Sequence, residues 1–198
     1  MNLEPVLHFV REREAIRHKR LAGEAAPWTD DPILQRYRFC NVRREHDRVS
    51  QWLIRNVLVP PVPPEVQWRS LDRFLLLAAL CRWVNWPPTI ELLLEHFMTI
   101  NPPDFEVIGH KIDARTASGE KAWTGAYMVR AKPGYGKGKG HFIVVDVIKN
   151  CLLPALPSIR EALQTGSRQA TWAAFNRVNN FGSFTSGQIV ADLGYTAL

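Results

Sequence analysis

The feature that most constrains the fold of this chain is a helix-length run from Val66 to Trp86 with apolar residues on nearly every side. These residues are Leu71, Phe74, Leu75, Leu77, Ala78, Leu80, Cys81 and Val84. A helix that is apolar all round offers no face to water and is therefore buried in a protein core. The run predicts a helical protein built around residues 66–86.

Length and charge narrow the class of protein further. The chain has 198 residues, of which 46% are hydrophobic, enough to form one domain with a good core. Its formal net charge of +6 indicates an acidic partner. Nucleic acid is favoured over a membrane surface because the positive charge lies in several segments rather than on one amphipathic helix.

The cysteines and the apolar runs indicate the compartment. Cys40, Cys81 and Cys151 are odd in number and far apart, so neither a disulfide framework nor a metal site is expected. The N-terminus does not resemble a secretion signal, and the most apolar run, residues 74–80, is far too short to span a bilayer. A reducing cytoplasm is the expected location.

Near the N-terminus, residues 31–48 combine arginines, aromatic residues and carboxylates between a helix start and an apolar run. Asp31 is suited to cap a helix and Pro32 to occupy its first turn. Apolar residues then recur at roughly helical spacings, which predicts a stripe along one side with the arginines on the other faces. The stripe consists of Ile33, Leu34, Tyr37, Val42, Val49, Trp52, Leu53 and Val57.

The arginines of this segment are candidates for binding phosphate. Arg38, Arg43 and Arg44 carry permanently charged guanidinium groups whose planar donors match phosphate oxygens. Glu45 and Asp47 are suited either to orient these arginines or to act as a base. A solvated helix face with exposed ion pairs, which are individually weak, explains the spacing equally well.

The rest of the chain is expected to be mainly helical. Gly23 ends the first helix, whose charged run favours a solvated face over contact with a nucleic-acid backbone. Trp28, beside a proline, is either a packing residue or a surface for base stacking. His96 and His110 are expected to be structural, and the prolines of residues 59–64 a stiff connector. Further helices are expected at residues 3–21, 89–98, 105–114, 142–156, 159–164 and 170–178.

An extended segment at residues 122–130 is followed by a glycine- and lysine-rich stretch at 133–140. Lys137 and Lys139 are each followed by glycine, whereas a P-loop places a hydroxyl residue after its lysine. The stretch therefore predicts a flexible basic loop that touches a nucleic-acid backbone. Without a P-loop, the main sequence evidence for a kinase function is missing.

The C-terminal residues 175–193 predict a helix, a glycine-containing turn and a second helix. In a helix-hairpin-helix, the turn and the free N–H groups of the next helix grip a backbone phosphate without reading sequence. Asn180 occupies the place of the usual first glycine and tolerates a left-handed backbone. The residues assigned to DNA contact are Asn180, Gly182, Ser183, Phe184 and Thr185, together with the lysines of the basic loop. A glycine cap between packed helices is the alternative.

Three separated segments together resemble the phage DNA-base hypermodification family. This family includes the α-glutamyl/putrescinyl-thymine pyrophosphorylases, or amino acid:DNA transferases, and the helical domain of 5-hydroxymethyluracil DNA kinases. The matching motifs are Pro27-Trp28-Thr29 with residues 31–34 and 37–44, then Thr124-Gly125-Ala126-Tyr127, and finally residues 181–184 with 188–193.

The resemblance implies an all-α, DNA-glycosylase-like helix-hairpin-helix fold, as a single domain over residues 1–198 with the hairpin near 170–193. A small extended or hairpin segment is expected near 122–140. The implied substrate is double-stranded phage DNA with a modified thymine, in the cytoplasm of the infected host. A kinase of that pathway pyrophosphorylates 5-hydroxymethyluracil, and the transferase replaces pyrophosphate with an amino acid or amine. Without a P-loop, the transferase branch is favoured.

The implied reaction suggests roles for individual residues of this chain. The departing pyrophosphate gains negative charge, which preorganised arginines stabilise, and the candidates are Arg38, Arg43 and Arg44. Asp47 or Asp192 is the candidate for the base that takes the proton of the amine. The substrate-binding candidates are Trp28, Tyr37, Asn41, Thr124, Tyr127 and Gln188. Neither a metal nor a cofactor is expected beyond the amino acid co-substrate. The alternatives are a non-catalytic DNA-binding partner of a 5-hydroxymethyluracil DNA kinase, a DNA glycosylase and a purely structural helical protein.

Overall fold

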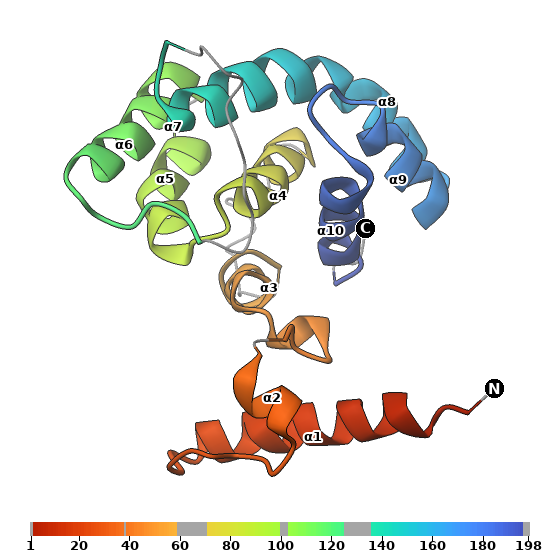
Figure 1. The fold of residues 1–198 in the computed structure, drawn as a ribbon. Helices are drawn as coiled ribbons and strands as arrows, with labels where there is room; N and C mark the ends of the chain where they lie inside the picture. Colours follow the sequence, from red (N-terminus) through yellow and green to blue (C-terminus); the bar gives the residue numbers. More distant parts are fainter. Residues whose placement is uncertain (1, 38, 59–70, 100–102, 125–135, 196–198) are drawn as a thin grey trace. The chain divides into compact units, whose positions relative to one another are not determined.

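The computed structural model describes residues 2–37, 39–58, 71–99, 103–124 and 136–195, and every regular element in these ranges is a helix (Figure 1). The predicted all-helical class is therefore confirmed for the described residues. The chain divides into two compact units, Met1–Gln51 and Trp52–Leu198. The organisation as one domain and the DNA-glycosylase-like fold stay predictions.

The N-terminal unit begins with the predicted helix, α1 (Glu4–Leu21). Gly23 follows the helix with φ +77°, a left-handed conformation that costs glycine little. The N–H of Glu24 then donates to the carbonyl of Lys19 at 3.0 Å and closes the C-terminus. Gly23 therefore ends α1 as predicted.

The next helix, α2 (Pro32–Arg36), starts where the sequence predicted but is short. Asp31 Oδ1 accepts the N–H groups of Ile33 and Leu34 at 2.8 and 3.1 Å. At Tyr37 the backbone becomes extended, with φ −105° and ψ 148°. The continuous helical stripe predicted from residue 33 to 57 is therefore wrong.

A second helix start interrupts the predicted apolar stripe. A 3-10 turn, η1 (Arg44–His46), precedes α3 (Arg48–Leu53), which continues into η2 (Ile54–Leu58). Asp47 caps α3, because its Oδ2 accepts the N–H groups of Val49 and Ser50 at 3.1 and 3.0 Å. Two capping aspartates thus define separate short helices, and helical spacing alone does not reveal the extended stretch between them.

The C-terminal unit is built around α4 (Leu71–Val84), in which every residue from Phe74 to Val84 is buried. The predicted core helix is confirmed over this range, whereas residues 66–70 and the connector at 59–64 lie outside the described residues. The predicted helices α5 (Pro87–Thr99) and α6 (Phe105–Ala117) follow. α4 packs against α5, and α5 against α6.

One uninterrupted helical stretch then runs from residue 139 to 164 (Figure 1). It comprises α7 (Lys139–His141), the π-helical η3 (Phe142–Leu152) and α8 (Leu153–Gln164). The predicted break after Leu156 is wrong, because Pro157 lies inside α8. The wider π-helical turn of the preceding residues, with Leu153 N–H bonded to Ile148, changes the register before the prolines.

The stretch 139–164 is long and apolar enough to cross a membrane, unlike the shorter apolar run at 74–80. Half of its most apolar window is buried inside the protein, and the core helix of a soluble protein meets the same criterion. The apolar character of this stretch is therefore weak evidence for a membrane span.

The chain ends with α9 (Arg168–Asn176) and α10 (Ser183–Leu193), the predicted pair of helices. α10 packs against both α9 and α4. The extended segment expected near 122–140 is unsupported: residues 122–124 and 136–138 form no strand, and residues 125–135 lie outside the described part of the chain.

Candidate functional site

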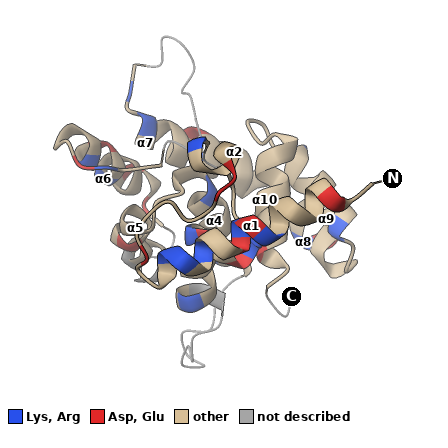
Figure 2. Ribbon diagram, turned by 60° about the horizontal axis from the view of Figure 1, so that its bottom comes forward, with Lys and Arg blue, Asp and Glu red and all other residues tan. Residues whose placement is uncertain are grey.

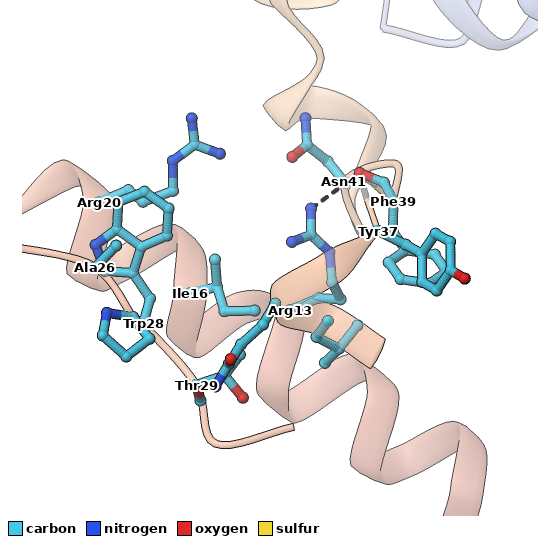
Figure 3. Close-up of a pocket in the computed structure, with 12 residues that line it drawn as sticks. Arg13, Ile16, Arg20, Ala26, Trp28, Thr29, Tyr37, Phe39 and Asn41 are labelled. Atoms are coloured by element: carbon cyan, nitrogen blue, oxygen red, sulfur yellow. Dashed lines mark hydrogen bonds between the residues drawn. The ribbon is translucent and has the colours of Figure 1, made fainter. Parts of the chain in front are cut away.

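An open hollow of about 890 Å³ lies within the N-terminal unit (Figure 3). Trp28, Tyr37 and Asn41, all predicted to bind substrate, line it together. Figure 3 shows Trp28 and Tyr37 on opposite sides, with Ile16 and Arg13 between them. The full lining is Arg13, Ile16, Arg20, Ala26, Pro27, Trp28, Thr29, Leu34, Gln35, Tyr37, Phe39 and Asn41.

Arg13 and Arg20 of α1 bring two guanidinium groups to this hollow. Arg13 Nη2 donates to the carbonyl of Phe39 at 3.0 Å, and the Arg20 guanidinium carbon lies 5.1 Å from the centre of the Trp28 ring. Neither arginine was predicted from the sequence as a site residue, because both belong to the charged run of α1, whose basic residues are marked in Figure 2. Their spacing of seven residues, with Ile16 buried between them, is the signal that identifies the shared face.

Hydrogen bonds hold the loop before α2 against α1. Trp28 Nε1 donates to the carbonyl of Glu24 at 2.7 Å, and Lys19 Nζ donates to the carbonyl of Trp28 at 2.9 Å. The Thr29 hydroxyl donates to Glu12 Oε2 at 2.5 Å. The indole is thus held in place at the side of the hollow.

Among the described residues, the predicted phosphate-binding arginines do not line the hollow. Arg43 is exposed, and its Nη1 lies 4.0 Å from Glu45 Oε1. Arg44 lies in η1, and Arg38 lies outside the described residues. The role of these three arginines at a leaving group stays a prediction.

The two predicted bases have structural partners. Asp47 caps α3 through two backbone N–H groups. Asp192 of α10 forms a buried ion pair with Arg82 of α4, in which Arg82 Nη2 donates to Oδ1 at 2.6 Å and Nε donates to Oδ2. The Asp192 side chain is 3% exposed, so its carboxylate is not open to a substrate in this arrangement. Next to this pair, burial raises the pKa of the Cys81 thiol.

The turn between α9 and α10 has the expected local geometry. Asn180 has φ +70°, which confirms the left-handed backbone predicted at this position. Phe181 is buried and stacks on Phe175 with ring centres 6.3 Å apart. Gly182 is the N-cap residue of α10, and Ser183 and Phe184 are exposed. The turn is thus anchored from inside while its outer residues remain accessible.

The remaining substrate-binding candidates belong to the C-terminal unit. Thr124 Oγ1 accepts a hydrogen bond from the Asn85 amide at 2.9 Å in the C-terminal unit. Gln188 is half-buried on α10. Tyr127 lies outside the described residues. A role for these residues in substrate binding stays a prediction.

The lysine-rich stretch ends in a helix rather than in a flexible loop. Asp113 of α6 accepts the N–H groups of Gly140 and His141 at 2.6 and 3.0 Å, so a carboxylate already occupies the start of α7. Lys139 Nζ lies 4.3 Å from the centre of the Trp123 ring, and burial lowers the pKa of Lys139. Lys137 is exposed, 3.0 Å from His141 Nε2. DNA contact by either lysine stays a prediction.

The described residues contain no group of three or more histidine, cysteine, aspartate or glutamate side chains that is suited to hold a metal ion. In the same residues Cys40, Cys81 and Cys151 are free.

Comparison with known proteins places these features in a family. A family model described as the helical domain of 5-hmdU DNA kinase matches residues 2–198. A 5-hmdU DNA kinase of Bacillus phage SP10 is 34% identical over 126 residues, which cover 62% of this chain and 19% of the phage protein. This chain therefore matches only about a fifth of that kinase's length. No solved structure matches significantly.

These findings confirm the predicted relation to the helical domain of 5-hmdU DNA kinases, and the narrower assignment to amino acid:DNA transferases stays a prediction. The chain belongs to the family of 5-hmdU DNA kinase helical domains.

Proposed function

We propose that this chain acts on thymine-derived bases in double-stranded phage DNA and transfers an amino acid or amine onto 5-pyrophosphoryloxymethyl-deoxyuridine. The amine nitrogen forms a bond to the methylene carbon, and the carbon–oxygen bond breaks as its electron pair leaves with pyrophosphate. The amine's proton passes to water. The family supports a 5-hydroxymethyluracil-derived substrate. The transfer reaction rests on the resemblance of the sequence motifs to amino acid:DNA transferases.

The turn between α9 and α10 carries the proposal that the substrate is a DNA polymer. Left-handed Asn180 and the accessible start of α10 match what a backbone phosphate requires of a helix-hairpin-helix. Asn180→Gly keeps the left-handed conformation accessible, whereas Asn180→Val does not. We expect Asn180→Val to weaken duplex binding in fluorescence anisotropy, while Asn180→Gly binds as the unmodified chain does.

Mass spectrometry tests the transfer. The protein is incubated with DNA that contains pyrophosphorylated 5-hydroxymethyluracil and a pool of amino acids and amines, and the DNA is then digested to nucleosides. A new aminoacyl or amine-bearing nucleoside together with free pyrophosphate supports the proposal. DNA with unphosphorylated 5-hydroxymethyluracil is the control and should stay unchanged, because hydroxide is a poor leaving group.

A second function is favoured by the structural partners of Asp47 and Asp192, which engage both predicted bases. In this alternative the chain is a non-catalytic, DNA-binding partner of a 5-hmdU DNA kinase, as the description of its family suggests. Duplex binding with no new nucleoside under any amine, and faster phosphorylation when a 5-hmdU DNA kinase is added with the chain, would favour this function. Abasic sites in the product would instead indicate a glycosylase.

A further inference from the structure

We propose that the hollow in the N-terminal unit binds the extruded pyrimidine nucleotide, with Arg13 and Arg20 on the phosphates of its 5-substituent and Trp28 against the base. This inference rests on the proposed function, because it names the substrate class that the hollow accepts. It assigns the anion to two arginines of α1 rather than to the arginines of residues 38–44.

The charge of the lining favours an anion. The twelve described residues that line the hollow include two arginines and no aspartate or glutamate. The neighbouring carboxylate of Glu12 accepts the hydroxyl of Thr29 at 2.5 Å. An incoming phosphate therefore meets guanidinium donors without a carboxylate in the lining to repel it.

Arg13 is the anchored member of the pair. Its Nη2 donates to the carbonyls of Phe39 and Cys40 at 3.0 and 3.4 Å, which hold the guanidinium in position. Its Nε is buried and has no hydrogen-bond partner among the described residues. The phosphate is therefore expected to meet the terminal Nη groups of Arg13 rather than this enclosed Nε.

Arg20 is the exposed member, one face of its guanidinium resting on the Trp28 ring. A stacked guanidinium keeps its edge N–H groups available for phosphate oxygens. The two arginines are seven residues apart, or about 10 Å along a helix axis. In Figure 3 the guanidinium groups of Arg13 and Arg20 and the amide of Asn41 border the same opening. An elongated anion such as a pyrophosphate on a base matches this span better than a single phosphate does.

The hollow also offers groups for the pyrimidine itself. The indole N–H of Trp28 is used by Glu24, so Trp28 contributes ring surface rather than a donor. Asn41 Nδ2 donates to the carbonyl of His46 at 2.9 Å, which leaves Oδ1 as an acceptor. Gln35 Nε2 likewise donates to the carbonyl of Thr29 at 2.6 Å. A uracil ring presents an N3–H donor that such an amide oxygen accepts.

The volume suits a nucleotide. About 890 Å³ lies within the usual range of small-molecule sites, about 300–1,000 Å³. Because a base inside a duplex does not reach a hollow of this kind, the nucleotide has to leave the stack, which costs a few kcal/mol. Charged contacts to its pyrophosphate group would offset this cost.

Titration calorimetry with free nucleosides tests the site without any transfer reaction. The probes are 5-pyrophosphoryloxymethyl-deoxyuridine, 5-hydroxymethyl-deoxyuridine, inorganic pyrophosphate and glutamate. We expect the pyrophosphorylated nucleoside to bind at least about tenfold more tightly than each other probe, because it alone engages both the arginines and the indole. Equal affinity for inorganic pyrophosphate, or preferential binding of glutamate, would overturn the assignment.

Variants of exposed residues avoid a loss of folding. Arg20→Gln should weaken binding of the pyrophosphorylated nucleoside about tenfold, because a charged hydrogen bond is lost. Arg11→Gln is the matched control: Arg11 also lies on α1, but it pairs with Glu4 and does not line the hollow. Arg13→Lys should weaken binding as well, because lysine has no planar fork of donors. Unchanged affinity in Arg20→Gln would refute the proposal.

The results also separate this inference from the proposed function. If the nucleoside binds as expected but no amine is transferred, the site stands and the transferase does not. If transfer proceeds on DNA and Arg20→Gln leaves its rate unchanged, the transferase stands and the assignment of the hollow is wrong.

Discussion

The two compact units use charged side chains in opposite ways. In the C-terminal unit, Arg82 and Asp192 neutralise each other in the core, with exposed fractions of 1% and 3%. In the N-terminal unit, Arg13 and Arg20 border an open hollow, and Arg20 is exposed. The first pair joins α4 to α10, whereas the second leaves donors for a ligand. Charge of the same kind thus has a structural role in one unit and a proposed binding role in the other.

The units also differ in what stabilises them. From Phe74 to Val84 every residue of α4 is buried, whereas Ile16 is the one buried residue of α1. Caps and side-chain hydrogen bonds, such as those of Asp31 and Trp28, organise the N-terminal unit instead. Apolar burial supplies most of the stability of a folded protein, so changes in the C-terminal unit should have the larger effect.

The largest effect is expected from Arg82→Met. The substitution leaves the Asp192 carboxylate buried without its partner, which should lower the free energy of unfolding by about 3–5 kcal/mol. Urea denaturation followed by circular dichroism measures this loss. The double variant Arg82→Met with Asp192→Leu removes both charges and should recover part of it. A single variant as stable as the unmodified chain would contradict the structural role of the pair.

The second-largest loss of stability is expected from Gly140→Ala. A Cβ at this position would lie 2.6 Å from Ile112 Cβ and 2.7 Å from the Gly109 carbonyl oxygen, so α6 and α7 would have to separate. Such overpacking costs about 1–3 kcal/mol, measurable as a lower midpoint of thermal unfolding. Gly136→Ala is the control, since its Cβ would meet nothing within 4 Å. Equal destabilisation by both would argue against close packing at Gly140.

Asp47→Ala should have a smaller effect, about 1 kcal/mol, because the N-terminus of α3 loses its cap. Asp47→Ser retains a capping oxygen and should restore stability. The two variants also test whether Asp47 is the predicted catalytic base. An Asp47→Ser variant that is stable but inactive in the transfer assay would support that role, whereas full activity would show that Asp47 acts only as the cap of α3.

The smallest effect concerns pH and is local to α2. The backbone N–H of Leu34, then that of Ile33 and the neighbouring His8, lower the pKa of Asp31 below its usual value of 3.8. A lowered pKa in the folded state means that the carboxylate stabilises the fold above the unfolded pKa, and the contribution is lost as pH falls through the folded value. The NMR titration of Asp31 should therefore have a midpoint below 3.8. A midpoint at or above this value would contradict the cap.

Local signals in the sequence were reliable where one residue determines the backbone around it. Gly23, Asp31 and Asn180 each ended, capped or turned the chain as predicted, because these residue types have strong conformational preferences. The buried helix α4 was equally predictable, since no soluble surface tolerates an apolar residue on every side.

Patterns that depend on distant partners were less informative. The spacing from Ile33 to Val57 is helical, yet the chain turns extended at Tyr37, and a second cap restarts it at Asp47. Arg13 and Arg20 were missed because a mixed-charge helix has the same pattern whether its basic side chains face water or a hollow. Nothing local in the sequence indicated that Asp192 is paired with Arg82, since 110 positions separate them.

The sequence by itself therefore determined the helical class, the buried central helix, several helix ends and the family relation. The tertiary structure alone decided which charged groups are buried in pairs and which border the hollow. The physical reason is range: caps and helical periodicity act within a few residues. Burial and ion pairing depend on segments that meet only after folding.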